Sequence, residues 1–270
     1  MNHQNEPNQT PDASGSDTLD GISRRQRILQ KLEEYGEVSV NALAQEFGVS
    51  PMTIRRDLHL FARQGIVETH YGGAHLSRNR TTIPDFPTRS EKMLSYKQAI
   101  GRVAASFIKE GDTIFLDSGT TSVQITKYFP DVHATLITNS MSAVMQLGTN
   151  RKIRLVVAPG TYQEQIGGTL DISTVEFLRR YHVNKSFIGT MFCSTDYGMT
   201  TSEELDAELK RTLCMQSDQS FLMADHTKFT GNSLVKFTEF WDYDYIITNK
   251  ELDPKLQEEV KKLNPNLILC

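Results

Sequence analysis

The sequence predicts an α/β protein made of two parts: a small N-terminal unit of three helices and a β-hairpin, then a Rossmann-like, mostly parallel sheet with helices on both faces. Helical apolar spacing starts after residue 22 and gives way to two short strands around a Gly-Gly pair. From residue 113 on, continuous apolar strands alternate with helices, as in a parallel sheet covered on both sides. A chain of 270 residues, 38% of them hydrophobic, is long enough for two cores.

The charge distribution singles out the first unit. The net charge is −4, yet residues 22–80 carry nine Lys and Arg against six Asp and Glu, whereas residues 1–21 carry four acidic residues and no basic one. A positive segment in an acidic chain indicates where a polyanion could dock, although ordinary solvated helix faces vary by as much.

Composition excludes several classes of protein. No apolar run approaches the ~18 residues that span a bilayer, and the N-terminus lacks the apolar core of a signal peptide, so no membrane association is expected. Cys193, Cys214 and Cys270 are odd in number and far apart, which fits neither a disulfide framework nor a zinc site. We therefore expect the reducing cytoplasm, no metal and no cofactor.

The third helix of the small unit has the clearest sequence signals. Ser50 is placed to cap it, and Pro51 stands at its first position, where a missing N–H costs nothing. Its apolar residues recur at i, i+4 and i+7, which defines an inward face. That face is formed by Ile54, Leu58 and Phe61.

The rest of the chain divides by composition. A polar stretch, rich in Asn, Gln, Pro and Asp, is expected to be disordered, and a polar stretch with two prolines is expected to be a linker in which Phe86 can dock. The predicted segments are a disordered tail (1–21), a winged helix-turn-helix (22–76), a linker (77–90) and an α/β domain (91–270). Within the last, strands are expected at 113–117, 135–138, 154–158, 185–189, 220–224 and 245–248, and helices at 91–109, after the SGTT turn, from Ser140, and near 172–181, 203–216 and 254–263.

Three short helices followed by a hairpin are the arrangement of a winged helix-turn-helix, whose third helix enters the DNA major groove. Arg side chains there can bind guanine in a bidentate way. Two adjacent arginines are more often a solvated face, but the string VSPMTIRRDL joins a cap, a buried spine and two cations in a dozen positions. We predict DNA contacts from the reader helix, the first helix and the wing, namely Arg24, Arg25, Ser50, Met52, Thr53, Arg55, Arg56, His70, Tyr71, Gly72 and Gly73.

In the second unit, polar loops follow two neighbouring strands. The segment DSGTT (117–121) joins the first strand to a helix, and backbone N–H groups with hydroxyls in such a turn can hold an anion. TNS (138–140) ends the second strand beside it, although Ser140 alone is better explained as a helix cap. Asp206 and Lys210, at i and i+4, are either site residues or a surface ion pair.

Residues 23–76, above all SVNALAQEFGVSPMTIRRDLHLFARQGIVETHYGGAHL, resemble the DeoR-type transcriptional regulators. Two features of the wing depart from that family: Glu68 and Thr69 stand where basic residues are usual, and Tyr71 stands where a His is usual. The wing is therefore less positive, and its contacts with phosphates are weaker unless His70 compensates.

Residues 84–250 resemble the DeoR C-terminal sensor domain, which is similar in fold to ribose-5-phosphate isomerase and binds phosphorylated sugars. DSGTT, TNS, FIG (187–189), GMTT (198–201) and ADHTKF (224–229) carry the resemblance, with Arg89 and Lys97 ahead of them. Two departures, Pro159-Gly160 and the apolar run 191–193, imply an atypical effector or one that is larger or less polar. The resemblance implies that the effector is bound by Asp117, Ser118, Gly119, Thr120, Thr121, Asn139, Ser140, Asp206, Lys210, Asp225 and Lys228.

The prediction is a DNA-binding transcriptional regulator, a repressor of a carbohydrate-metabolism operon, controlled by a phosphorylated sugar. Its partners would be a double-stranded DNA operator and further copies of the chain, in a homodimer or homotetramer, because one reader helix buries little DNA surface. One alternative is a sugar-phosphate isomerase-like enzyme with an appended DNA-binding module, although no motif sets a general base against a substrate carbon. Another is a scaffold that has lost ligand binding.

Overall fold

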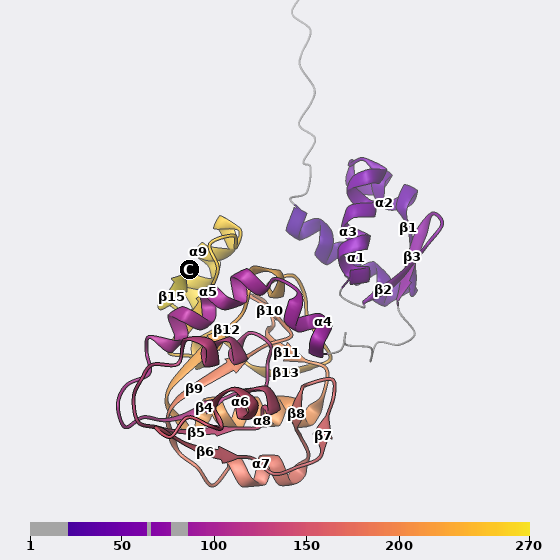
Figure 1. The fold of residues 1–270 in the computed structure, drawn as a ribbon. Coiled ribbons are helices and arrows are strands. Elements are labelled where there is room, and N and C mark those ends of the chain that lie inside the picture. The colour runs from indigo at the N-terminus through magenta and orange to yellow at the C-terminus, as the bar shows by residue number, and fades with distance from the viewer. Residues whose placement is uncertain (1–20, 64–65, 77–85) are drawn as a thin grey trace, which may run out of the picture. The chain divides into compact units, whose positions relative to one another are not determined.

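A computed structural model describes residues 21–63, 66–76 and 86–270 (Figure 1). The chain forms two compact units, with the division between residues 78 and 79, and each unit is considered by itself. The predicted tail, except for Gly21, and residues 77–85 of the predicted linker lie outside the described residues. Among the residues described, no helix has the length and apolar character needed to cross a membrane.

The small unit has three helices and a three-stranded antiparallel sheet. The predicted hairpin is formed by β2 and β3, and a third strand, β1, pairs with β3 in the order β1-β3-β2. The elements are α1 (Gly21–Tyr35), β1 (Glu37–Ser39), α2 (Val40–Phe47), α3 (Pro51–Arg63), β2 (Val67–His70) and β3 (Gly73–Leu76).

The predicted spacing correctly identifies the core of this unit. Ile54, Leu58 and Phe61 of α3 are at most 1% exposed, and they pack with Ile28 and Leu32 of α1. Burying five large apolar side chains contributes roughly 1.5–3 kcal/mol each, which fixes the rotation of α3 about its axis. The opposite face of α3 is therefore left at the surface.

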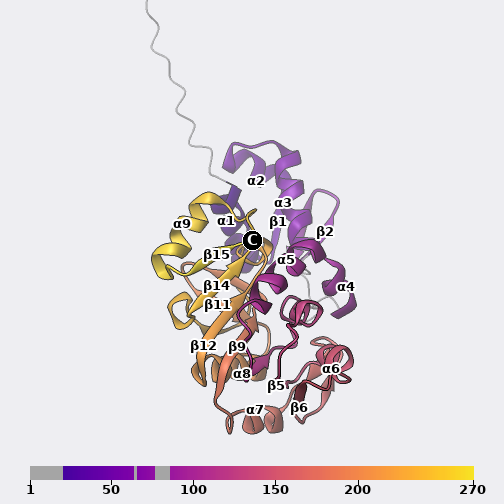
Figure 2. The ribbon, with the colours of Figure 1, turned by 60° about the vertical axis from the view of Figure 1, so that its left-hand side comes forward.

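The large unit is built on a seven-stranded parallel sheet in the order β15-β14-β12-β9-β4-β5-β6. The chain starts in the middle at β4, runs outward to β6, returns to β9 beside β4, and then runs outward to β15; the turned view in Figure 2 shows β9 beside β12. The strands are β4 (Thr113–Leu116), β5 (Ala134–Thr138), β6 (Ile153–Val157), β9 (Val183–Gly189), β12 (Ser217–Met223), β14 (Tyr245–Thr248) and β15 (Leu267–Leu269).

Helices cover both faces of this sheet, as predicted. In β4, Phe115 joins an apolar cluster with α7 (Ile172–Leu178), α8 (Glu204–Met215) and α9 (Pro254–Leu263). Its neighbours Ile114 and Leu116 point to the other face and join a cluster with α5, η1 and α6. These last three are α5 (Leu94–Ala105), the 3₁₀ helix η1 (Ser122–Tyr128) and α6 (Met141–Leu147).

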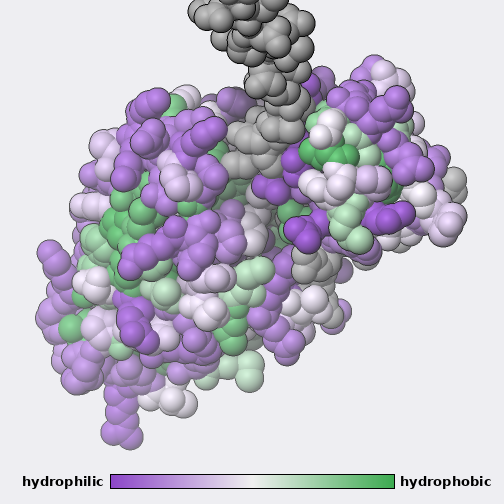
Figure 3. All heavy atoms as spheres, turned by 90° about the horizontal axis from the view of Figure 1, so that it is seen from above, coloured by the Kyte–Doolittle hydropathy of each residue, from purple (hydrophilic) through white to green (hydrophobic). Residues whose placement is uncertain are grey.

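Smaller elements complete the large unit. A three-stranded antiparallel sheet has the order β10-β11-β13, and β7 pairs with β8. On the face drawn in Figure 3, polar residues predominate and apolar residues lie between them in small groups. The bounds are α4 (Phe86–Glu91), β7 (Tyr162–Gln163), β8 (Gly168–Thr169), β10 (Phe192–Ser194), β11 (Gly198–Thr201), η2 (His226–Lys228), β13 (Val235–Thr238) and η3 (Phe240–Asp242).

Two predicted segments are corrected. Residues 86–90, expected in the linker, belong to α4, and the helix expected over 91–109 is divided by Met93, whose φ is +57°. Phe86 explains the first correction, because its ring packs against Gly167, where a Cβ would lie 2.6 Å from the ring. A residue anchored in this way holds its own segment on the sheet domain rather than in a linker.

Helix α5 lies unusually close to η1, and this contact sets the position of the loop after β4. A Cβ added to Gly101 would lie 2.7 Å from Cβ of Gln124 and 2.8 Å from its carbonyl carbon. Only a glycine permits that approach. The Gln124 side chain in turn donates a hydrogen bond to the Thr120 carbonyl (3.2 Å).

We therefore predict that Gly101→Ala destabilises the large unit. A mid-helix Gly→Ala change normally stabilises by roughly 0.5–1 kcal/mol, but overpacking here costs about 1–3 kcal/mol, so the net effect is a lower Tm. Differential scanning calorimetry checks this, with the exposed Ser95→Ala in the same helix as the control. An unchanged or higher Tm for Gly101→Ala would show that the contact is not restrictive.

Candidate functional site

Helix α3 presents a basic face to solvent. Arg55 and Arg56 are exposed, and Met52 is 61% exposed, while Ile54 on the opposite side is fully buried. The packing of the apolar side thus holds both guanidiniums at the surface. They lie in the N-terminal half of α3, and this is the part of a reader helix that contacts bases in the major groove.

The start of α3 is closed by side chains. Ser50 Oγ accepts the backbone N–H of Thr53 (3.1 Å) and lies 2.9 Å from Thr53 Oγ1. Ser50 therefore caps α3, as predicted. Both hydroxyls are hydrogen-bonded to each other, yet Ser50 is exposed and Thr53 is partly exposed, so each can still reach a DNA phosphate.

Arg24 corrects the predicted set of DNA contacts. Its Nε lies 2.7 Å from Asp57 Oδ2, and the two side chains are only 10% and 6% exposed. A guanidinium buried in this pair joins α1 to α3 and is not available to a DNA phosphate. Arg25 lies 3.6 Å from Asp57 Oδ1 and stays 24% exposed, so it remains a candidate.

The wing places the predicted residues in three different environments. Tyr71 is fully exposed at the tip, next to Gly72 with φ +97°. His70 Nε2 lies 3.0 Å from Glu37 Oε1, so its ring is held beside a carboxylate. Gly73 is buried, and a Cβ there would lie 2.3 Å from the Val38 carbonyl oxygen, so we correct its assignment: it is required by packing against β1.

In the large unit, Asp117 lies where the strand order reverses. It follows β4, and its fully buried Oδ2 accepts hydrogen bonds from the Gly189 N–H at the end of β9 (2.9 Å) and from Lys210 Nζ of α8 (2.9 Å). Ligands of open parallel sheets bind at this switch point, beyond the carboxyl ends of the strands. The carboxylate therefore ties β4, β9 and α8 together at the expected edge.

Lys210 forms a buried ion-pair triad with Asp117 and Asp206. Its Nζ lies 3.2 Å from Asp206 Oδ1, and Asp206 Oδ2 accepts the Thr201 hydroxyl (2.5 Å). Burial lowers the pKa of Lys210, but Asp117 and Asp206 outweigh it, so the pKa is raised overall. The surface-pair alternative is thus wrong, because Lys210 and both carboxylates are buried.

The loop after β4, residues 118–121, has an unusual backbone. In the part of the chain that the structure describes, no acceptor is found for the N–H groups of these four consecutive residues. Three buried polar atoms beside the loop also lack partners there: Asp117 Oδ1, Ser122 Oγ and Asn139 Oδ1. Unpaired buried polar groups are rare, and in a cluster they indicate a bound ligand or ordered water.

The helix-terminus part of the cradle prediction is corrected. The element after the loop is η1, a 3₁₀ helix of seven residues, and not an α-helix. So short a helix adds little dipole, and any anion must be held by the loop amides themselves.

The loops after β4 and β5 meet, as predicted. Asn139 Nδ2 donates to the Thr169 carbonyl (3.0 Å) and lies 3.5 Å from Ser118 Oγ. Ser140 is different: its hydroxyl accepts the Ala143 N–H (3.3 Å) and caps α6. The capping alternative holds for Ser140, and it is not a free ligand group.

A second group of charges lies at the end of β12. Asp225 caps η2 through the Thr227 N–H (3.0 Å), and Lys228 follows one turn later. The structure adds Lys97 of α5, which the predicted site set omits. Lys97 is 3% exposed, its Nζ donates to the Arg89 carbonyl, and burial lowers its pKa to about 8 against the opposing effect of Asp225.

The apolar run 191–193 is only partly a site lining. Cys193 is fully buried in the core, and its Sγ donates to the Lys228 carbonyl (3.6 Å). Phe192 is 8% exposed in β10, and Met191 Sδ accepts the Ser233 hydroxyl (3.5 Å). Cys193 therefore contacts η2, and Phe192 and Cys193 are buried, whereas Met191 is partly exposed.

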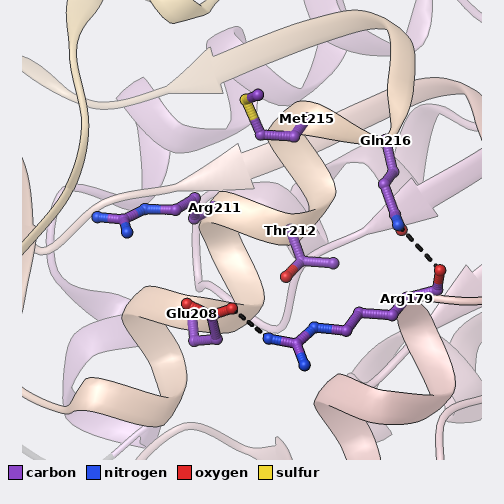
Figure 4. A pocket seen from close by; sticks show the side chains of 6 residues that line it. All are labelled: Arg179, Glu208, Arg211, Thr212, Met215 and Gln216. Carbon is purple, nitrogen blue, oxygen red and sulfur yellow. Dashed lines mark hydrogen bonds and ion pairs between the residues drawn. The ribbon is translucent and has the colours of Figure 1, made fainter.

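A surface hollow elsewhere in the unit carries none of these groups. Figure 4 shows it between α7 and α8, where Arg179 pairs with Glu208 (2.5 Å) and the Gln216 side chain donates to the Arg179 carbonyl (2.9 Å). Both guanidinium groups of its lining, Arg179 and Arg211, are already hydrogen-bonded within the protein. The unpaired polar groups that could bind a ligand lie at the switch point instead.

Comparison with known proteins places both units. The DeoR C terminal sensor domain matches residues 92–250, more than half of the chain, and the DeoR-like helix-turn-helix domain matches residues 24–80. The chain belongs to the DeoR family. The predicted resemblance is thus confirmed, and the protein is a DNA-binding transcriptional regulator.

Two similar relatives of this DeoR-family chain are repressors by name. A putative aga operon transcriptional repressor of Escherichia coli O157:H7 is 30% identical over 96% of this chain and 97% of its own length. A glycerol-3-phosphate regulon repressor of Haemophilus influenzae is 28% identical over 92% and 96%. That family members are regulators decides against the enzyme alternative. Among solved structures, ribose 5-phosphate isomerase A from Methanocaldococcus jannaschii aligns over 49% of this chain and 53% of its own, with TM-score 0.36 and 16% identity.

We predict that Lys210→Met destabilises this regulator by about 3 kcal/mol, because removing one partner leaves a buried charge uncompensated. Adding Asp117→Asn to Lys210→Met should recover part of the loss. Urea unfolding at pH 7 measures both, with the exposed Lys261→Met of α9 as the control. A free energy of unfolding equal to wild type for Lys210→Met would mean that the triad does not hold Asp117 in place.

Proposed function

We propose that this DeoR-family protein represses a carbohydrate-metabolism operon and that a phosphorylated sugar, bound at the switch point between β4 and β9, controls its DNA binding. The observation that carries the proposal is the loop 118–121 with its four unpaired N–H groups, next to three buried polar atoms without partners. Amides in such a loop suit a phosphate, and the orphan carboxylate, amide and hydroxyl oxygens suit sugar hydroxyls.

On the DNA side, α3 is the reader. Arg55 and Arg56 divide between guanine edges and phosphates, and Met52 and Thr53 lie beside them on the exposed face. Arg25 and the wing tip at Tyr71 and Gly72 add contacts to the backbone or the minor groove. His70 is close to Glu37, so the wing contributes less positive charge than the reader.

A single reader helix covers one half-site, so we infer that the protein acts as a homodimer or homotetramer on repeated or palindromic half-sites. The protein would act where its operator lies, in the bacterial cytoplasm. Its three cysteines are free thiols, in keeping with a reducing compartment.

Loss of either reader arginine should weaken operator binding by about 10- to 100-fold without unfolding the protein, since each bidentate base contact is worth roughly 1–3 kcal/mol. Fluorescence anisotropy with a duplex selected by the wild-type protein measures Arg55→Ala and Arg56→Ala, with the exposed Arg180→Ala of the large unit as the control. An arginine that contacts phosphate lowers the salt slope of binding by about 1 when removed. If both variants bind as tightly as wild type, α3 is not the reader.

Phosphorylated pentoses and hexoses should raise the Tm of the wild type and change its operator affinity, whereas the unphosphorylated sugars should not. Asn139→Leu removes an orphan oxygen from the site, so we expect at least a tenfold loss of effector affinity with operator binding intact. Asn184→Leu, at the opposite end of the neighbouring strand β9, is the matched control. No Tm shift with any sugar phosphate would instead support the scaffold that has lost ligand binding.

A further inference from the structure

The large sheet ends on one side at β6, and no strand among the described residues pairs with the outer side of β6 (Figure 1). An edge strand can pair with another chain, so proteins usually protect it with lysines, prolines, bulges or a very short length. The opposite edge strand, β15, is three residues long. By contrast, β6 has five residues in regular register with β5, and its sequence IRLVV contains neither lysine nor proline. The edge at β6 is therefore the less protected one.

The backbone of β6 offers unpaired hydrogen-bonding groups at this edge. The Ala158 N–H, just after the strand, donates to the Thr138 carbonyl of β5 (2.9 Å). Because alternate residues of a strand direct their peptide groups to opposite sides, the N–H and C=O groups of Leu155 and Val157 point away from β5. For these groups no partner is found in the part of the chain that the structure describes.

Apolar side chains accompany these backbone groups. Val157 is 42% exposed, and Leu155 is half-buried. Helix α6 packs on the same face of the sheet as Leu155, and its Met145 is 82% exposed. Exposed apolar side chains beside an unpaired strand edge are typical of a surface that associates with another chain.

The two ends of β6 differ in charge. At its start, Arg151 and Arg154 are exposed, and neither forms an ion pair with the residues that the structure describes. Beyond its other end, Asp171 Oδ2 accepts the Thr161 N–H (2.8 Å). Hydrogen bonds from Ser173 and Thr161 hold the pKa of Asp171 well below its usual range, so this carboxyl group is an anion. A strand that is basic at one end and acidic at the other complements an antiparallel copy of itself.

We propose that two copies of the chain pair along β6, antiparallel about a two-fold axis at Leu155, so that their two sheets become one. This rests on the proposed function, which calls for a second reader helix. In this register Leu155 faces its own copy, and Val157 faces Ile153 of the second copy, so the outward N–H groups meet outward carbonyls. Arg154 faces Val156 and not another arginine, which avoids like charges directly opposite each other.

Sedimentation of the full-length protein tests the interface. Wild type should sediment as a dimer or tetramer, and Val157→Pro as the species of half that mass. Proline removes an outward N–H and leaves the pairing with β5 intact. The two-fold axis doubles the loss, so the dissociation constant of this interface should rise about 30-fold. Val157→Thr keeps the N–H, and Met215→Lys changes an exposed side chain of α8; both should sediment like wild type. Circular dichroism checks that each variant is folded.

Disulfide crosslinking in a Cys270→Ser background tests the register. Directly opposite residues of a hydrogen-bonded antiparallel pair have Cα atoms about 5.5 Å apart, which a disulfide can span. Leu155→Cys should therefore crosslink two chains when oxygen and a copper catalyst oxidise the thiols. Val157→Cys is the matched control, because its two copies would lie about 13 Å apart along the strands. Non-reducing electrophoresis measures both.

The proposal is overturned if folded Val157→Pro sediments like wild type, if Val157→Cys crosslinks as fast as Leu155→Cys, or if wild type is a monomer, including one whose β6 binds a different protein. Operator binding and sugar-phosphate binding by the same samples distinguish the two failures. If both persist in any of these cases, the proposed function stands and only the interface is wrong. If wild type binds neither ligand, the proposed function fails, while sedimentation and crosslinking still decide the interface.

Discussion

The buried carboxylate of Asp117 is the constraint on which the sensing unit depends. A charge with no exposure to water requires a countercharge and hydrogen-bond donors, and these come from α8 through Lys210 and from the end of β9 through Gly189. Strands β4 and β9, on either side of the switch point, and helix α8 are thereby joined at one atom, Asp117 Oδ2. The other oxygen, Oδ1, has no partner among the described residues and remains available to a ligand.

The same principle sorts the arginines of the DNA-reading unit. Asp57 is buried on the inner side of α3 and holds Arg24 in a close ion pair and Arg25 in a longer one. Arg55 and Arg56, on the other side of the same helix, are exposed, and among the residues that the structure describes neither forms an ion pair. Asp57 thus makes Arg24 a residue that stabilises the fold, whereas Arg55 and Arg56 are left available to contact DNA.

The sequence predicts structural features that depend on local periodicity, but not those that depend on a partner far away in the chain. The spacing of Ile54, Leu58 and Phe61 fixes which side of α3 is buried, and alternating apolar strands and helices fix the parallel sheet. Arg24 and Arg25 are adjacent and have similar spacing to the apolar residues, so the sequence alone does not distinguish them. Arg24 stabilises the fold because it pairs with Asp57, more than 30 residues away.

Lys97 shows the converse case. It lies in an amphipathic helix where a lysine normally faces water, and only the packing of α4 and η2 around it produces its burial and lowered pKa. The family pattern contained a signal, since Lys97 stands at a position of that pattern. It was a weak signal, because the burial of Lys97 follows from the packing of α4, α5 and η2, which are separate segments of the sequence.

The resulting site has a direction. The proposed effector, a phosphorylated sugar, carries a dianion at one end and hydroxyls at the other, and the carboxylates of Asp117 and Asp206 lie together at Lys210 of α8. A phosphate placed against these two carboxylates would be repelled, and the repulsion is strongest in a medium of low dielectric constant. Lys210 is already paired with both carboxylates, so it does not offset that repulsion.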